Sequence, residues 1–286
     1  MKLAGAPISW GVCEVPDWGL QLAPDRVLKD MRSLDLHATE AGPPGFLPAD
    51  PVAARALLDS SGIRLIGGFV TAVLHESARR ADELASVKRQ AEWLAAGGSE
   101  LVVLAPALAQ TGYSGATAIP DGAWRELFEG IDRVAEIAGS YGLGIAVHPH
   151  WGTAIERPSH IERFVQGSAH ALCLDTGHIA LGGADPLEVA RKAGPRVRHV
   201  HLKDVDGALG ARVRDGALSY DDAVRAGLFR ALGDGAARIK DVLGHLRMTG
   251  YAGWYVLEHD VMLDSEPAPG PPDWIAQSAA FARKNA

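Results

Sequence analysis

Short apolar segments alternate with longer amphipathic segments along the whole chain. The apolar segments predict eight strands, at residues 3–8, 37–40, 64–69, 101–104, 144–148, 171–175, 197–201 and 254–258. Periodic apolar positions between and after them predict helices at residues 24–33, 51–61, 78–96, 124–141, 159–166, 186–192, 236–248 and 272–284. A strand followed by a helix, repeated eight times, is typical of a parallel sheet.

Eight such units favour closure into a barrel. An open doubly wound sheet would also alternate strands and helices, but the segment ISWGVCEV after the first strand lacks the glycine pattern of a dinucleotide-binding turn. The length of 286 residues suits one barrel domain. We therefore expect a single-domain α/β (β/α)8 TIM barrel over residues 1–286. Two connections, at about 206–234 and 260–272, are long enough to serve as active-site loops.

Composition and charge limit the kinds of molecule that this protein is expected to bind. The net charge is −7 and the pI is near 5.9, and no clustered Lys/Arg segment is present, which argues against a nucleic-acid partner. The two cysteines are too few for a disulfide framework, and no long apolar run indicates a signal peptide or a membrane span. These features favour a cytoplasmic enzyme with a small-molecule substrate. They leave the oligomeric state open, a homo-oligomer included.

Polar residues follow the apolar segments at the predicted carboxyl ends of several strands. They occur in ATEAG, HPHWGTAIE, ALCLDTGH, VRHVHLKD and GWYVLEHD. Barrel enzymes build their sites at this end of the sheet. Carboxylates and imidazoles that converge there would be poorly compensated without a positive charge, so we expect one divalent cation. Oxygen and nitrogen ligands suit Mn²⁺, Co²⁺, Mg²⁺ or Zn²⁺.

Each of these residues also has a structural interpretation. Asp175 could cap the turn that follows it, and His199 is better explained as a packed histidine within a buried strand. Trp10 could be a core aromatic or a wall for the substrate ring. Lys203 could lie on the surface or contact the substrate, and Glu40 could form an ion pair or bind a substrate hydroxyl. The nearby His178 favours the functional interpretation of Asp175, whereas the sequence does not separate the two roles of Glu40.

Motifs along nearly the whole chain resemble those of the xylose isomerase-like barrel superfamily of sugar isomerases, epimerases and dehydratases. Within it, APISWG, TEAG, HPHWGT, DTGHIALGGADP, HVHLKD, GLFRALGDG and GYAGWYVLEHD resemble the inosose dehydratases, which remove water from a keto-inositol. The resemblance implies one divalent metal, manganese or cobalt first, held by Glu, Asp, His and Glu from strands five to eight. Asp175, His201 and Glu258 occupy three of these positions.

The ligand from strand five departs from the superfamily pattern. His148 stands where many relatives have Glu, and Pro149 interrupts the motif. Because proline ends a strand, His150 is expected in the following loop, and Glu156 on the same loop could fold back over the mouth. A carboxylate suits a hard cation better than a second imidazole. We therefore expect Glu156 as fourth ligand, with His148 and His150 contacting the substrate.

The expected reaction begins with removal of the proton beside a carbonyl group in a small polyhydroxylated substrate. The base would be Glu156 or His148, and His178 or Glu258 would be the second proton-transfer group. Trp10, Glu40 and Lys203 would join His148 and His150 in substrate binding. The alternatives are a sugar or hydroxypyruvate isomerase or epimerase, an apurinic endonuclease and a non-catalytic sugar-binding barrel.

Overall fold

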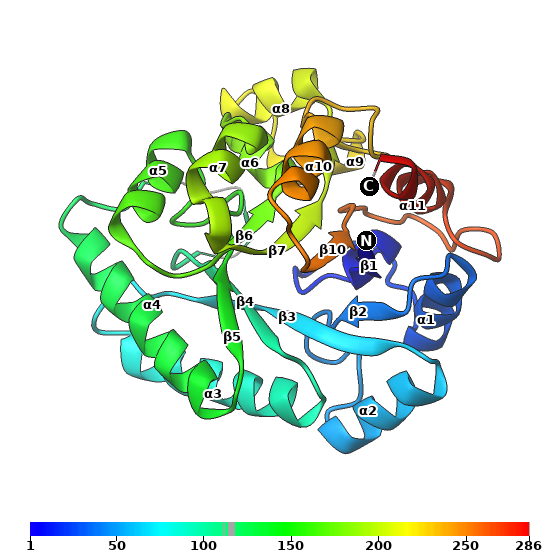
Figure 1. Ribbon diagram of the computed structural model, residues 1–286, viewed down its shortest axis with the longest axis horizontal. Helices are drawn as coiled ribbons and strands as arrows, with labels where there is room; N and C mark the ends of the chain where they lie inside the picture. The colour runs from blue at the N-terminus through cyan, green and yellow to red at the C-terminus, as the bar shows by residue number, and fades with distance from the viewer. Residues whose placement is uncertain (111, 114–117, 286) are drawn as a thin grey trace.

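The computed structural model describes residues 1–110, 112–113 and 118–285. Eight parallel strands close into a barrel in the order β1-β10-β7-β6-β5-β4-β3-β2 (Figure 1). These strands are β1 (Lys2–Gly5), β2 (Ala38–Glu40), β3 (Arg64–Ala72), β4 (Leu101–Pro106), β5 (Gly144–Val147), β6 (Leu172–Asp175), β7 (Val197–Leu202) and β10 (Trp254–Leu257). The predicted barrel is confirmed, and each strand overlaps its predicted segment.

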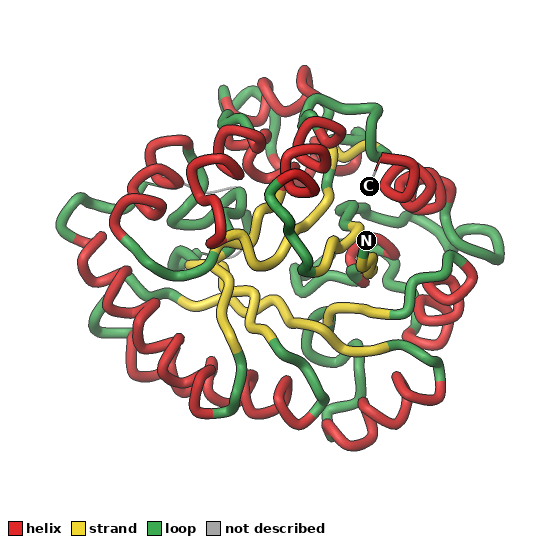
Figure 2. Tube along the Cα trace, viewed as in Figure 1, coloured by secondary structure: helices red, strands yellow, loops and turns green. Residues whose placement is uncertain are grey.

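Helices surround the barrel on its outside (Figure 2). They are α1 (Pro24–Ser33), α2 (Pro51–Ser60), α3 (Arg80–Ala96), α4 (Ala123–Ser140), α5 (Pro158–Gly167), α6 (Thr176–Gly182), α7 (Pro186–Ala193), α8 (Gly207–Arg214), α9 (Tyr220–Arg225), α10 (Ile239–Met248) and α11 (Asp273–Asn285). Short 3-10 helices occur at Pro7–Trp10 and Gly194–Arg196. Within the described ranges, no helix combines the length and apolar character needed to cross a membrane.

Local sequence signals fix the ends of these helices. Asp50 precedes α2 and accepts hydrogen bonds from the backbone N–H groups of Val52 and Ala53, while proline at the first position pre-forms the helical turn. Gly142 and Gly250 follow α4 and α10 with positive φ angles of 77° and 74°. Glycine adopts this left-handed conformation without steric cost, so the chain can turn back into the next strand.

The apolar core lies mainly between the barrel and its ring of helices, where the outward faces of the strands pack against apolar helix faces. The barrel interior is filled by smaller groups. Ala4, Ala38, Ile66 and Val256 form one interior cluster, and Val103, Ala146 and Cys173 form another. Small side chains in the interior leave room for buried polar groups at the carboxyl-terminal mouth.

The structure differs from the predicted elements in three places. The first strand ends at Gly5, because Pro7 lacks an N–H for the ladder and begins a 3-10 helix. Helix α6 follows β6 directly, although Gly177 and Gly182 weaken its helical signal. The long segment after β7 contains α8, α9 and a hairpin of β8 (Asp204–Val205) with β9 (Phe229–Arg230).

Candidate active site

Five acidic or imidazole side chains come together where the barrel strands end. Asp175 is the last residue of β6, Glu40 is the last residue of β2, and His201 lies near the end of β7. His148 directly follows β5, and Glu258 directly follows β10. Strand register explains the meeting, because Asp175 pairs with His201 across β6 and β7 in a parallel ladder. The residues are therefore brought together by the backbone of the barrel.

His201 is at the centre of this cluster. Its Nδ1 lies 2.7 Å from Glu258 Oε2, 3.0 Å from His148 Nε2 and 3.5 Å from Asp175 Oδ2. Its Nε2 lies 2.9 Å from Glu40 Oε1. The imidazole thus has one nitrogen toward the barrel interior and one toward a group of potential ligand atoms.

The donor set fits a divalent cation. Asp175, Glu258 and Asp260 are three carboxylates within 3.7 Å of one buried ammonium group, that of Lys203. A fourth carboxylate, Glu40, contacts His201. Asp175 Oδ2 is buried and accepts no hydrogen bond from any described residue, although His148 Nε2 lies 3.4 Å away. Buried negative charge of this kind needs a positive partner. His148, Asp175, His201 and Glu258 present the oxygen and nitrogen atoms that such a cation would use.

Lys203 contacts Glu258 of this cluster and also Asp260, an acid outside the cluster. Its Nζ lies 2.7 Å from Glu258 Oε1, 2.8 Å from Asp260 Oδ1 and 2.8 Å from His178 Nε2. The side chain is fully buried, and the Tyr220 hydroxyl donates to the other Asp260 oxygen at 2.7 Å. Lys203 therefore links two acids of the segment after β10 to His178 on α6.

Burial and neighbouring charges shift the pKa values of the ionisable groups in opposite directions. Burial would raise the pKa of Glu258, but the positive charges of His201 and Lys203 lower it to about 2. Burial would likewise raise the pKa of Asp175, yet Lys203 and His178 hold it well below its usual value. Burial would lower the pKa of Lys203, but Asp260 and Glu258 raise it. Both carboxylates and the ammonium group are therefore charged at neutral pH.

A cavity of about 380 Å³ opens beside the cluster. His150, His201, Glu258 and Asp260 line it together with aromatic side chains; the aromatic part of the lining consists of Trp18, Phe69, Tyr113 and Tyr220. A volume of this order accommodates a small organic ring, and aromatic walls with a few polar groups are typical of ligand sites. The cavity therefore has room for a small molecule next to the candidate ligands.

His150 is held in one tautomer at the cavity wall. Its Nδ1 lies 2.6 Å from the carbonyl oxygen of Trp151, and because a carbonyl can only accept, Nδ1 carries the proton. Burial lowers the pKa of His150 well below its usual value, and the neighbouring positive charge of Lys203 acts in the same direction. The imidazole is therefore neutral, with a lone pair on Nε2.

Two residues expected at the site have other surroundings. Glu156 is buried, accepts a hydrogen bond from Gly152 N at 2.7 Å and pairs with Arg157 Nε at 2.6 Å. The described groups of ligand atoms that lie within 4.8 Å of one another do not include Glu156. Trp10 is fully buried and its indole donates to Asp30 on α1 at 3.3 Å.

The remaining expected residues lie in the cluster or beside it. His178 follows β6 on α6, donates its backbone N–H to Asp175 and lies against His150, with ring centroids 3.7 Å apart and the rings tilted by 37°. His199 has a specific partner, because its Nε2 lies 2.7 Å from Glu40 Oε1. Glu40 therefore contacts two histidines.

Sequence reasoning missed Asp260 and Tyr220. Asp260 looks like part of a solvated loop start, yet it lies two residues after Glu258 and reaches the same Lys203. Residues two apart in an extended chain point to the same side, and this spacing was the signal that could have identified Asp260. Tyr220 lies on α9, inside a segment expected to be a loop, and no pattern in the sequence indicated that its hydroxyl would meet Asp260.

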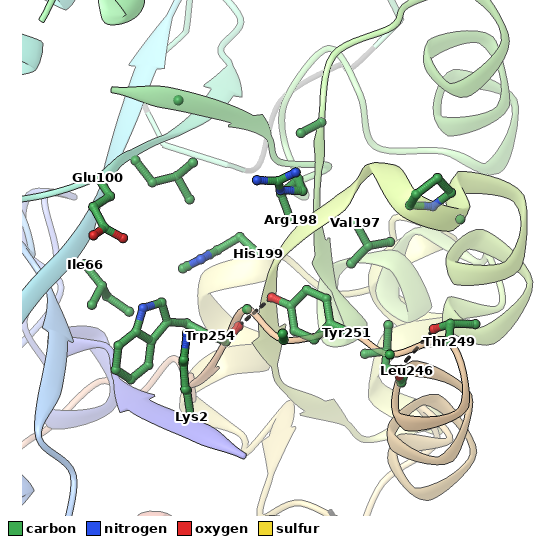
Figure 3. A pocket seen from close by; sticks show the side chains of 18 of the residues that line it. Lys2, Ile66, Glu100, Val197, Arg198, His199, Leu246, Thr249, Tyr251 and Trp254 are labelled. Carbon is green, nitrogen blue, oxygen red and sulfur yellow. Dashed lines mark hydrogen bonds between the residues drawn. The ribbon is translucent and has the colours of Figure 1, made fainter. Parts of the chain in front are cut away.

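A second cavity, of about 900 Å³, lies at the opposite end of the barrel, and we call it the basal cavity (Figure 3). The first residues of several strands line it, including Lys2, Leu101, Gly144, Val197 and Trp254. Although it is larger, the acids and imidazoles described above gather at the other end, where barrel enzymes carry their chemistry. We therefore assign the active site to the smaller cavity.

Comparison with known sequences agrees with this architecture. The sequence model of the family described as "Xylose isomerase-like TIM barrel" matches residues 29–285. An inosose dehydratase of Geobacillus kaustophilus is 30% identical over 97% of this chain and 92% of its own length. A rhizopine catabolism protein, MocC, of Rhizobium meliloti is 32% identical over 90% of this chain and 81% of its own length.

Solved structures show the same fold at lower sequence identity. The probable 3-DHS dehydratase AsbF of Bacillus anthracis aligns with a TM-score of 0.72 and 13% identity over 99% of both chains. A D-psicose 3-epimerase of Clostridium cellulolyticum aligns with a TM-score of 0.70 and 18% identity, over 100% of this chain and 99% of its own. With these relatives and this barrel, the chain belongs to the xylose isomerase-like TIM barrel family and is an enzyme of the lyase or isomerase type.

Proposed function

We propose that this protein is a metal-dependent hydro-lyase that dehydrates a cyclic polyhydroxylated ketone of the inosose type. The observation that carries the proposal is the excess of buried carboxylates around His201 and Lys203, next to a cavity of about 380 Å³. The names of the two related proteins, an inosose dehydratase and a rhizopine catabolism protein, support the choice of substrate class.

The proposed metal ligands are His148, Asp175, His201 and Glu258. We propose His148 for the fourth position in place of Glu156, because His148 Nε2 lies 3.0 Å from His201 Nδ1 and 3.4 Å from Asp175 Oδ2. Oxygen and nitrogen ligands suit Mn²⁺ or Co²⁺, and also Mg²⁺ or Zn²⁺. When bound, such an ion acts as a Lewis acid toward the charge that develops on the substrate oxygen.

We assign the proton acceptor to His150. Its Nε2 carries a lone pair, and the side chain lines the cavity. In such a dehydration the C–H bond beside the carbonyl breaks first, and its electron pair shifts toward the carbonyl oxygen to give an enolate. When the C=O bond re-forms, the C=C bond forms and the neighbouring C–O bond breaks. The departing hydroxyl needs one proton to leave as water. The proton taken up by His150 can meet that need, so one imidazole can serve both steps.

Lys203 and Asp260 support this arrangement from behind the ligands. The Lys203 ammonium group orients Glu258, and Asp260 ties Lys203 to Tyr220 on α9. Tyr220 comes from the segment 206–234, and Asp260 begins the segment 260–272. We propose that these two segments form the cover of the active site, because this contact joins them beside the cavity. A cover excludes water from a reactive enolate.

An isomerase or epimerase of a ketose is the second candidate. The specific observation in its favour is that Glu258 and His150 both line the cavity and follow different strands, β10 and β5, since an epimerase needs proton-transfer groups on two sides of its substrate. The two functions share the removal of the first proton. They differ in whether a hydroxyl group leaves.

The test is a substrate comparison with metal-loaded protein. A keto-inositol, ketohexoses, hydroxypyruvate and a dehydroshikimate-type acid are each incubated with the Mn²⁺, Co²⁺, Mg²⁺ or Zn²⁺ form, and products are followed by dione absorbance and by NMR in D2O. We expect dehydration of the keto-inositol and loss of activity after chelation. Epimerised ketohexose without dehydration would select the second candidate, and full activity in protein shown to be metal-free would refute the metal site.

Two matched variants test the assignment of the proton acceptor. His150→Gln is expected to abolish exchange of the substrate proton beside the carbonyl while the protein keeps its metal. Glu156→Gln is expected to keep both exchange and metal, because its carboxylate binds Gly152 and Arg157. The opposite pattern, with exchange lost only in Glu156→Gln, would return the role to Glu156.

A further inference from the structure

Glu40 contacts the imidazole that stands at the centre of the ligand cluster. Its Oε1 lies 2.9 Å from His201 Nε2, on the side of the ring away from Asp175 and Glu258. Glu40 is 4% exposed, and an ionised carboxylate can only accept hydrogen bonds. His201 Nε2 must therefore carry a proton in this contact. With the Nε2 proton held by Glu40, it is Nδ1, which faces Glu258, that would give up its proton to a cation.

The same oxygen of Glu40 is held from the basal side. His199 Nε2 lies 2.7 Å from Glu40 Oε1, and His199 precedes His201 by two residues on β7, so both side chains point into the barrel. Figure 3 shows His199 at the wall of the basal cavity, directed toward Ile66 and Trp254. No described residue hydrogen-bonds to its Nδ1. One neutral imidazole can therefore give its only proton to Glu40.

We propose that Glu40 and His199 are positioning residues, which fix the tautomer and orientation of His201 so that Nδ1 faces the metal. The inference rests on the proposed metal site and concerns how this chain prepares it. A carboxylate that accepts the outer N–H of a metal-binding histidine fixes the ring and makes it a stronger ligand. Here the carboxylate is itself fixed by a second histidine.

Two alternative roles for Glu40, His199 and His201 fit the geometry less well. The first alternative role is to bind a second metal ion, because the three residues offer ligand atoms within 4.8 Å of one another. Both nitrogens, however, already lie at hydrogen-bond distance from a single oxygen, and His201 would have to bind two ions. In the second role, Glu40 binds a substrate hydroxyl, since it also lines the smaller cavity. That role predicts a change in KM and leaves metal affinity unchanged.

The experiment uses Zn²⁺, which is diamagnetic, as the metal probe on the full chain. Zinc affinity is measured by competition with a chelator for wild type, Glu40→Gln, His199→Leu and His199→Gln. Glu40→Gln is expected to lower affinity about 10- to 100-fold, the usual effect of removing such a partner. His199→Leu should give a smaller loss, and His199→Gln should restore affinity because its amide can still donate to Glu40.

The control is Glu100→Gln, the same exchange on the rim of the basal cavity, where Glu100 pairs with Arg64 on the surface. It should leave zinc affinity unchanged. A second readout is the ¹⁵N NMR spectrum of the His201 ring in the zinc form. We expect Nδ1 bound to zinc and a slowly exchanging proton on Nε2 in wild type, with faster exchange of that proton in Glu40→Gln.

The outcomes separate this inference from the proposed function. If wild type binds no zinc at these residues, the metal site itself is refuted. If zinc binds but Glu40→Gln keeps wild-type affinity, or changes only KM, the positioning role is refuted and the metal site stands. Should Glu40→Gln fail to fold, the wild-type spectrum still decides, because zinc bound through Nε2 of His201 would overturn the inference.

Discussion

Asp204 is the acid whose replacement should cost the most stability outside the ligand cluster. It is 1% exposed, at the start of the long segment after β7, and its two oxygens accept four backbone hydrogen bonds. The donors are the N–H groups of Val205 (3.0 Å), Gly233 (2.9 Å), Gly235 (3.2 Å) and Ala237 (2.9 Å). The perturbation is Asp204→Asn, which keeps the size of the side chain and replaces one acceptor oxygen by an NH2 group.

Whichever oxygen is replaced, two of the four backbone N–H groups then face a donor. Oδ2 accepts from Gly233 and Gly235, and Oδ1 accepts from Val205 and Ala237. A Cβ on Gly235 would lie 2.4 Å from Oδ1, so the segment wraps tightly around the carboxylate and leaves little room for water. Each buried donor left without an acceptor costs about 1–3 kcal/mol, so the free energy of unfolding should fall by about 2–6 kcal/mol.

For a chain of 286 residues, this loss corresponds to a decrease in Tm of about 3–10 °C. The assay is thermal and urea unfolding followed by circular dichroism. The matched control is Asp206→Asn, two residues on, where the side chain caps α8 by accepting from Ala208 and Leu209. Asn caps helices as well as Asp, and the partly exposed ion pair of Asp206 with Arg230, which the exchange also removes, contributes little, so the control should change stability by less than about 1 kcal/mol. Equal effects of the two variants would refute the reasoning.

Two further predictions concern the surroundings of the site. Tyr220→Phe removes the donor to buried Asp260, so the free energy of unfolding should fall by about 1–3 kcal/mol and KM should rise, as measured by urea unfolding and steady-state kinetics. An unchanged KM would contradict the proposed cover. Gly182→Ala would place a Cβ 2.1 Å from the Glu156 carbonyl oxygen and should lower Tm, whereas Gly139→Ala, on the open face of α4, should raise stability by about 0.5–1 kcal/mol. A Tm for Gly182→Ala at or above that of wild type would contradict this packing.

Most barrel strands were predictable because they are apolar segments that end at or just before a glycine, a proline or an ionisable residue. The elements that were missed have weak local patterns. Helix α6 contains glycine at positions 177 and 182, and its stability comes from the Asp175 side chain at its N-terminus and from burial against β7. Helices α8 and α9 are short, at eight and six residues, and a helix of that length depends on tertiary packing. Such packing is not visible in local periodicity.

Within the site, the residues that could be predicted were those whose positions are set by the backbone of the barrel. Residues at strand ends, such as Asp175 and His201, could be placed together because parallel register brings strand ends to one mouth. Partners that meet through side chains from distant elements could not be placed. His199 illustrates this limit, because strand alternation predicts that it points inward, but only the structure gives Glu40 as its partner, 159 residues away.

In the motif HPHWGTAIE after β5, a side chain on a loop long enough to reach the site can still point elsewhere. The strand ends at Val147, before Pro149, as the missing proline N–H predicts. After it, the loop bonds to itself, since His150 N donates to the Ile155 carbonyl at 3.1 Å and Thr153 N donates to the His150 carbonyl at 3.2 Å. A loop closed in this way offers its own backbone N–H groups to a nearby carboxylate, and Glu156 accepts one of them from Gly152. Because these local donors already bind the carboxylate, loop length alone does not determine whether an acid folds back to a site.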